Sequence, residues 1–369
     1  QMSRPAISIP KSGGWTFGSP SVLMMFYRAP GELQSELQEM DECMPHYYKI
    51  TNGHGQGAET IMRAEADFMR ACFADAQIML ERAYAQIDGN GQENMALCCD
   101  FLAWRLSLCT SFTPRESFEQ RREALLQQHN VAWLNILQSS CAYYYALLGL
   151  PEKIPAVFRE HQLASIHFLA PGKPMMELIE NQVYLAQGEY AKVIGHSEAL
   201  LGMCEAMHYA LVALHIRLQT AAAYEMLGKR ETADELLISA LAAAEPDALY
   251  LPFVENYRYL KTALTRGAGA KFAAFVRTVT PLGEDFVRRC GEKRAEGSRP
   301  AALAGLTERE SAIAALVAKR LSNREIAEQL FLSEGSVKQY INQIYSKLLI
   351  TGDVRTKRKR LAELAAPKS

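Results

Sequence analysis

The sequence predicts an all-α fold in which a repeat of paired helices precedes a small helix-turn-helix unit. Three observations predict it. Apolar residues recur at helical spacing along most of the chain, small residues end five apolar helices at a nearly constant interval, and two helix-capping sequences stand close together near residue 315. With 369 residues, the chain is long enough for two or three domains.

The repeat is marked by a small residue after each of five apolar helices. The intervals between these residues are 39, 39, 39 and 40, and the residues are Ala71, Thr110, Gly149, Gly188 and Gly228. A second helix is expected after each turn, most clearly at 73–83 and 232–240. Helix pairs that bury one face on the next pair form a solenoid, here over about residues 58–245. The pattern resembles tetratricopeptide (TPR) repeats, whose usual period is about 34 residues.

The segments around the repeat are less regular. Residues 1–57 are expected to be an irregular and helical segment, with a short buried helix or strand at 22–27, a helix that ends before Pro45 and a loop at 51–57. Two helices, at 249–265 and 271–290, are expected to cap the solenoid, so this domain spans 58–290. A charged linker is expected at 291–302 and a last domain at 303–366.

Two capping boxes define the start of the last domain. Thr307 stands three residues before Glu310, and Ser322 stands three residues before Glu325. In this arrangement the hydroxyl accepts from one free amide of the first turn, and the glutamate reaches back to another. The second helix is expected from about Asn323 to Leu330, with a tight connection to Ser333, which is expected to cap a third helix.

The third helix has one apolar side and one polar side. Val337, Ile341, Ile344 and Leu348 recur at helical spacing and form a single stripe. Lys338, Gln339 and Asn342 fall on the opposite side, where lysine suits guanine edges and glutamine suits adenine. A short helix, a turn and such a helix are typical of a DNA-binding helix-turn-helix. The alternative from periodicity alone is a small helical bundle with a solvated face.

These residues closely resemble the LuxR-type DNA-binding domain. The matching motifs are Leu306-Thr307, Arg309-Glu310, 321–327, Leu332-Ser333, 336–338 and 344–348. The resemblance implies a four-helix module whose third helix enters the major groove. It further implies base contacts by Lys338, Gln339 and Asn342, and phosphate contacts by Asn323, Ser333, Ser336, Tyr345 and Lys347.

Two positions depart from the family pattern. Tyr340 stands where the family often has histidine, and Leu349-Ile350 replaces the usual Gly-Val after Lys-Leu. The second departure leaves the geometry of the last helix open. The basic run at 355–360 fits either phosphate contact or the solvated face of that last helix.

The charge distribution agrees with a DNA-binding tail. Residues 301–369 carry 12 Lys and Arg against 7 Asp and Glu, whereas the whole chain has a net charge of −1. A basic tail on a mildly acidic body is expected when the tail binds double-stranded DNA. Because one module buries little surface, we expect a dimer on DNA.

The whole arrangement resembles MalT-like regulators, in which a helical-repeat sensor precedes a LuxR-type domain. That family often has an upstream ATPase switch domain, but no Gly-x-x-x-x-Gly-Lys-Ser/Thr run occurs in this chain. ATP is therefore expected only if an upstream domain exists in the full-length protein, and no cofactor is expected in this chain.

A small-molecule effector or protein partner is expected on the concave surface of the solenoid. The candidate ligand-facing residues are aromatic groups with polar neighbours and one loop histidine: Trp104, Trp133, Tyr143, Tyr144 and His54, with Tyr47 and Tyr48 beside them. The alternative is that the aromatic residues pack in the core and that His54 caps a helix.

Other functional classes have little support. No nucleophile elbow, phosphate loop or zinc-ligand spacing is present, so neither an enzyme nor a metal site is expected. The eight cysteines lack Cys-x-x-Cys pairs, and no apolar stretch reaches 18 residues. We expect a cytoplasmic transcription regulator without a membrane segment; the alternative is a repeat scaffold that recruits a partner protein to DNA.

Overall fold

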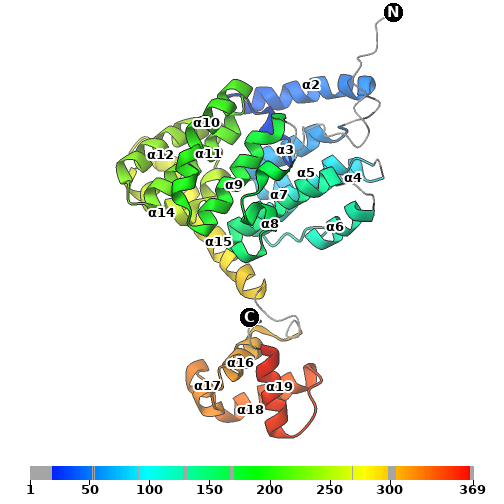
Figure 1. Ribbon diagram of the computed structural model, residues 1–369, viewed down its shortest axis with the longest axis vertical. Coiled ribbons are helices and arrows are strands. Elements are labelled where there is room, and N and C mark those ends of the chain that lie inside the picture. The colour runs from blue at the N-terminus through cyan, green and yellow to red at the C-terminus, as the bar shows by residue number, and fades with distance from the viewer. Residues whose placement is uncertain are drawn as a thin grey trace, which may run out of the picture. The chain divides into compact units, whose positions relative to one another are not determined.

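The computed structural model describes residues 19–51, 53, 55–89, 91–127, 131–166, 170–267, 269–297 and 305–365. Over this part of the chain it contains nineteen α-helices, four short 3-10 helices and no β-strand, so the predicted all-α class is confirmed. His54 lies outside the described residues. The chain divides between Cys290 and Gly291 into two compact units, called here the N-terminal and C-terminal units (Figure 1).

Long helices in antiparallel pairs form most of the N-terminal unit. Apart from α5 and α6, successive helices of this series pack against each other, as do the first helices of neighbouring pairs. The helices of this series are α3 (Ala58–Met69), α4 (Phe73–Ile87), α5 (Glu93–Cys109), α6 (Phe118–Gln127), α7 (Val131–Leu148), α9 (Lys173–Gln187), α10 (Tyr190–Met207), α11 (Ala210–Met226) and α12 (Arg230–Ala244).

The small residues that marked the repeat stand where these helices end. Gly149, Gly188 and Gly228 follow α7, α9 and α11 with φ of 70°, 78° and 75°, a left-handed conformation that glycine adopts without strain. Ala71 has the same conformation after α3, and Thr110 follows α5 in an extended one. The predicted helix ends are therefore confirmed at all five positions.

One expected second helix is missing. Between Gly149 and α9 the described residues form only short helical turns: η1 (Pro151–Lys153), α8 (Ala156–Arg159), η2 (Leu163–Ser165) and η3 (Ala170–Gly172). Pro151 and Pro155 each lack an amide hydrogen and disfavour a helical residue before them. The prediction of a second helix after each turn is wrong here because these prolines interrupt it.

The helix before the repeat is longer than predicted. α2 (Leu33–Thr51) contains Pro45 inside it, although the sequence predicted that the helix would end before this proline. Met40 and Met44 before the proline are buried, and Tyr48 after it packs against the same core. Tertiary packing on both sides therefore carries the helix past a residue that usually interrupts one.

Two short helices close the series on itself. α1 (Leu23–Phe26) and α13 (Leu251–Glu255) each contact both α3 and α11, the first helices of the first and last pairs. In α5, 15 of 17 residues are buried. Along α5 the described structure therefore leaves little exposed surface, because α1 and α13 lie where the two ends of the series meet.

A charged group lies at the centre of this closure. Arg105 of α5 donates from Nε and Nη2 to the Glu255 carboxylate of α13, at 2.8 and 3.1 Å. Tyr143 of α7 donates to the same carboxylate at 2.8 Å. All three side chains are buried, so the ion pair joins helices 150 residues apart without contact with solvent.

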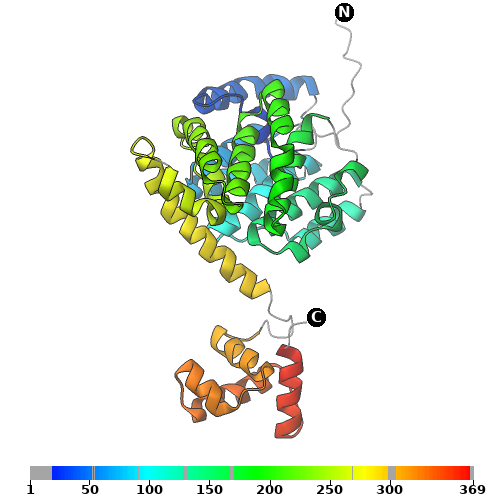
Figure 2. The same ribbon diagram turned by 60° about the vertical axis from the view of Figure 1, so that its left-hand side comes forward.

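Two further helices follow, α14 (Tyr257–Gly267) and α15 (Ala273–Gly297), the latter drawn in yellow in Figure 2. The N-terminal unit contains α14 and the part of α15 up to Cys290. α14 contacts α11 and α12, which fits its expected place at the end of the series. α15 continues past Cys290 to Gly297, into the stretch that was expected to be a linker.

The C-terminal unit consists of four described helices around one small core. They are α16 (Glu308–Ala318), α17 (Asn323–Leu330), α18 (Glu334–Lys347) and α19 (Val354–Ala365). α16 contacts the other three helices, and α17 contacts α18. The core takes residues from each helix, including Ile313, Ile326, Val337 and Leu361.

Candidate nucleic-acid interface

Local hydrogen bonds set the starts of α16 and α17. Thr307 and Ser322 accept from the amides of Glu310 and Glu325, and each glutamate accepts from the amide of its capping residue. Both predicted capping boxes are confirmed. They hold the first two helices of the unit at defined starting points.

A short turn leads from α17 to α18. Phe331 closes α17 in a left-handed conformation, with φ 54°. Ser333 then caps α18, since its hydroxyl accepts from the Ser336 amide at 3.0 Å. The turn and the cap together set the start of α18 relative to α17.

The two sides of α18 have the predicted chemistry. Val337, Ile341 and Ile344 are buried in the core. Lys338, Gln339 and Asn342 are exposed. The unit therefore presents three long or amide-bearing side chains on the free side of its third helix, as a helix that reads base edges requires.

The first group of predicted phosphate ligands lies near the helix starts. Ser333 and Ser336 lie at the N-terminus of α18, and their hydroxyl oxygens are 2.8 Å apart. Asn323, the first residue of α17, accepts from Arg358 Nη1 at 2.7 Å through its side-chain oxygen. Helix N-termini suit phosphate groups because free amides and the helix dipole face them.

Lys347 and Tyr345 have partners inside the unit. The Lys347 ammonium lies 2.7 Å from the buried carboxylate of Glu310. Burial raises the pKa of Glu310, but Lys347 and the bonds with Thr307 outweigh it and leave this pKa below its ordinary value. Tyr345 is 8% exposed and belongs to the core. Both residues therefore support the fold, and phosphate binding by either one stays a prediction.

Arg358 makes contacts that the sequence analysis did not single out. Besides its bond to Asn323, it donates from Nη2 to the Leu321 carbonyl at 2.6 Å. It thereby ties α19 to the start of α17. The sequence could have indicated these contacts, because Arg358 stands three residues before Leu361. Leu361 is buried, and residues three apart lie on the same side of a helix, so Arg358 lies on the inner side of α19.

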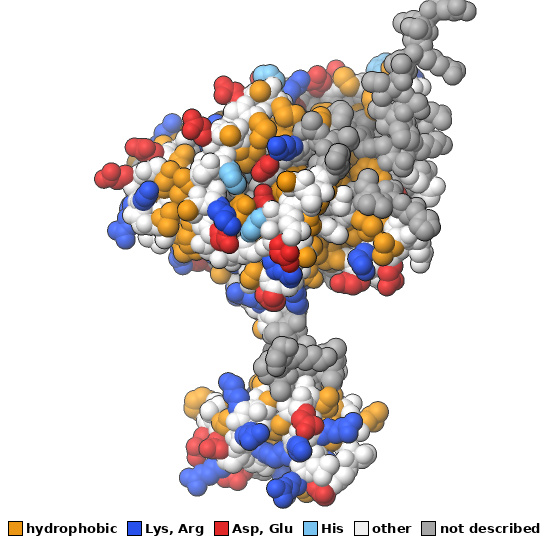
Figure 3. Space-filling view, viewed as in Figure 1, with side chains coloured by type: hydrophobic (Ala, Val, Ile, Leu, Met, Phe, Trp, Pro, Cys, Tyr) orange, Lys and Arg blue, Asp and Glu red, His pale blue; other side chains and the backbone are white. Residues whose placement is uncertain are grey.

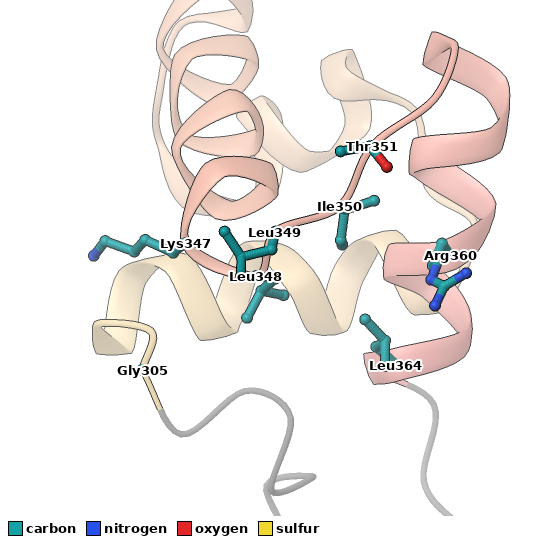
Figure 4. A pocket seen from close by; sticks show the side chains of 8 residues that line it. All are labelled: Gly305, Lys347, Leu348, Leu349, Ile350, Thr351, Arg360 and Leu364. Carbon is teal, nitrogen blue, oxygen red and sulfur yellow. The ribbon is translucent and has the colours of Figure 1, made fainter.

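A surface pocket of about 530 Å³ lies at the other end of α18. Figure 4 shows Leu348, Ile350 and Leu364 on its walls, between the end of α18 and α19. Lys338 and Gln339 stand in the first two turns of α18. The pocket is therefore separate from the side chains expected to contact bases.

The candidate ligand residues of the N-terminal unit are packed against other side chains. Trp104 donates to the Glu116 carbonyl at 3.0 Å, and its ring centre is 3.9 Å from that of Phe118. Tyr144 packs on the same phenylalanine at 5.4 Å. Trp133 is buried, and Tyr143 is bonded to Glu255. The structure does not bring these residues together around an open cavity in the described part of the unit, and ligand binding by them stays a prediction.

The four helices and their exposed residues define the class of the C-terminal unit as a helix-turn-helix DNA-binding domain. Residues 304–358 match the family model described as bacterial regulatory proteins, luxR family. This part of the chain is therefore a LuxR-family DNA-binding domain, and the resemblance predicted from its motifs is confirmed. The family model includes no residue before 304.

Two curated relatives also match. The chain is 41% identical over 63 residues to the transcriptional regulatory protein LnrK of Bacillus subtilis, which is 16% of this chain and 29% of that protein. It is 39% identical over 46 residues to the DNA-binding transcriptional activator DevR/DosR of Mycobacterium tuberculosis, which is 12% of this chain and 21% of that protein. The chain thus spans less than a third of either relative, and no solved structure matches it.

A membrane segment was not expected from the sequence. Among the helices of the described ranges, none is both long enough and apolar enough to cross a bilayer.

Proposed function

We propose that the protein is a sequence-specific transcription regulator in which α18 enters the major groove of double-stranded DNA. The observation that carries this proposal is the set of exposed residues Lys338, Gln339 and Asn342, opposite the buried stripe of α18. Lysine donates to guanine acceptors and the two amides pair with adenine edges, so these side chains supply direct readout. Ser333, Ser336 and Asn323 supply phosphate contacts that set the position of the helix.

We further propose that the N-terminal unit is a TPR-like helical-repeat sensor of the MalT-like kind. The five helix ends at a constant interval support this assignment. A ligand or partner that binds one state of this unit more tightly shifts its population, and that shift controls whether the DNA-binding domain is presented or dimerises. A dimer doubles the surface buried on DNA and requires a two-fold symmetric site.

Selection from random duplexes, followed by binding measurements on the selected site, tests the readout. Lys338→Ala and Asn342→Ala are expected to weaken binding to the selected site by about 1–3 kcal/mol and to relax one base position each. Lys347→Gln keeps a hydrogen-bond donor for the buried Glu310 carboxylate but removes the charge, and it is expected to weaken selected and random duplexes alike and to reduce the salt dependence.

The matched control is Lys261→Ala in the N-terminal unit, where the lysine is exposed and paired with Glu284. It removes the same charge and is expected to leave binding nearly unchanged. Equal losses on selected and random DNA for Lys338→Ala and Asn342→Ala would contradict their assignment to bases. Recovery of no enriched site by the full chain would contradict sequence-specific binding.

A further inference from the structure

An open cleft of about 720 Å³ lies in the N-terminal unit beside α9 and α10. The short turns that replace the missing helix after Gly149 form one wall, with His161 and Leu163. Residues of α9 and α10 line the other walls. Figure 1 shows where these two helices lie in the unit. Figure 3 shows histidine side chains among acidic and basic ones on the face over α9. The volume lies within the usual range of small-molecule sites.

The polar centre of the cleft is the carboxylate of Glu180 on α9. Its side chain is 8% exposed, and His161 Nδ1 lies 3.4 Å from its Oε1. Among the described residues, no hydrogen-bond donor is recorded on this carboxylate. Nearby Lys192 is paired with Glu189. A buried carboxylate without a donor is costly, so the site favours a group that brings one.

The hydrogen bonds around His161 show which of its nitrogens carries the proton. Gln187 Nε2 donates to the Arg159 carbonyl at 3.0 Å, which turns Gln187 Oε1 toward His161 Nε2, 2.8 Å away. His161 therefore donates from Nε2, and in the neutral ring Nδ1 is an acceptor. Nδ1 is buried and has no hydrogen-bond partner among the described residues. Two acceptors, Nδ1 and Glu180, thus face the same place.

Without a ligand both groups favour their neutral forms, and a neutral Glu180 can itself donate to His161 Nδ1, so a bound ammonium takes the place of that proton. Burial, with the negative charge of Glu177, raises the pKa of Glu180 to about 7. Burial also lowers the pKa of His161, despite its bond with Gln187. Each shift disfavours the charged form, so neither group supplies the other with a permanent ionic partner near neutral pH.

Apolar side chains surround this polar centre. Met176 on α9 and Leu200 and Met203 on α10 line the cleft. The Tyr184 ring stacks on His161, with centres 4.1 Å apart and planes inclined by 18°. A ligand that fits both features has a compact apolar body and one strong hydrogen-bond donor, and methionine side chains adapt to irregular apolar shapes.

We propose that this cleft binds a small molecule that carries a primary amine on an apolar body, with the amine between Glu180 and His161. The ammonium donates one hydrogen to the Glu180 carboxylate and one to His161 Nδ1, and the apolar body contacts Met176, Leu200 and Met203. Lys173 stands exposed at the edge of the cleft, so an additional carboxylate on the ligand has a partner there.

The inference deepens the proposed function because it names the chemical class of the effector. Its test measures ligand binding to the full chain without DNA. The two experiments are interpreted independently. If no amine binds, the DNA selection still tests the proposed function, and if no DNA site is selected, the titration still tests amine binding.

Calorimetric titration of the full chain with three matched probes tests the proposal. Phenethylamine has the amine alone, hydrocinnamate has the carboxylate alone, and phenylalanine has both on the same aromatic body. We expect at least one amine-bearing probe to bind and hydrocinnamate to bind at least tenfold more weakly. Binding of neither amine, or equal binding of hydrocinnamate, would overturn the proposal.

Substitutions locate the site. Glu180→Gln keeps the shape of the side chain and is expected to weaken amine binding at least tenfold. The control Glu198→Gln removes the same charge from an exposed position on α10 outside the cleft, and it should leave binding unchanged. Ala199→Trp places a large side chain at an exposed position in the cleft and is expected to block binding, which keeps the test decisive if Glu180→Gln misfolds. Unchanged amine binding in a folded Glu180→Gln variant would contradict the assignment. If Glu180→Gln misfolds, unchanged amine binding in Ala199→Trp would contradict it instead.

Discussion

Leu349 adopts a backbone conformation that does not suit its side chain. It follows α18 with φ 53°, and the residue is 85% exposed. An L-residue in this left-handed region costs about 1–2 kcal/mol relative to a right-handed one. The LuxR-type pattern usually has glycine here, and α19 nevertheless forms from Val354 to Ala365. The exposed leucine thus keeps a strained turn without packing that compensates for it.

Leu349→Gly is expected to stabilise the C-terminal unit by up to about 1 kcal/mol, because relief of strain exceeds the added freedom of the unfolded chain. Hydrogen exchange of amides in α18 and α19 measures the change as slower local opening. Leu349→Ala is the control, since it removes the exposed side chain but keeps a Cβ. Equal protection in both variants would show that the exposed side chain, rather than the backbone, sets the difference.

At the residue scale, the sequence predicted features whose cause is local. Both capping boxes, the cap at Ser333 and the buried stripe of α18 depend on residues a few positions apart, and each is present. The pairing of Lys347 with Glu310 and the contacts of Arg358 could not be predicted in the same way. They join positions 35 to 37 residues apart, so they depend on how the helices pack.

At the scale of elements, α14 and α15 approach each other too closely for any side chain at Gly283. A Cβ there would lie 2.2 Å from Tyr257 Cγ and 2.8 Å from Tyr257 Cβ. Tyr257 is buried, so it has little room to move. The glycine therefore sets the distance between α15 and the start of α14.

Gly283→Ala is expected to destabilise the N-terminal unit by about 1–3 kcal/mol through overpacking. Gly202→Ala on α10 of the same unit meets no atom within 4 Å and is expected to be neutral or to stabilise by up to about 1 kcal/mol. Trp104 and Trp133 are buried in this unit, and no tryptophan follows residue 133, so tryptophan fluorescence in a urea titration reports on it. Similar midpoints for the two variants would argue against the close approach.

The helices also show where single residues in the sequence do not predict the ends of an element. The helix ends followed the small residues, but Pro45 did not end α2, and Pro151 and Pro155 did remove a helix. The difference lies in the burial of Met44 and the packing of half-buried Tyr48 against the same core, which the local sequence does not reveal. The amine cleft was not predicted for the same reason, since it depends on the helix that is missing.

At the scale of the whole N-terminal unit, the buried pair of Arg105 and Glu255 holds α13 against α5. Glu255→Gln leaves the buried guanidinium without its counter-charge, and we expect a loss of about 3–5 kcal/mol in tryptophan-detected unfolding. The double variant Arg105→Met, Glu255→Gln keeps an acceptor for Tyr143 and removes both charges. It is expected to recover most of this loss. A double variant no more stable than Glu255→Gln would show that packing around Arg105, not its charge, dominates.

The closure by α1 also sets an order of events during synthesis of the chain. The Tyr27 hydroxyl, directly after α1, donates to Asp247, 220 residues later in the sequence. Helix pairs such as α3 and α4 join neighbouring residues and form as they emerge. At about 5–20 residues per second, the ribosome needs roughly ten to forty seconds to supply the distant partner. During that interval the apolar side chains of α1 lack the surface that finally covers them, so this is when the nascent protein most needs protection from aggregation.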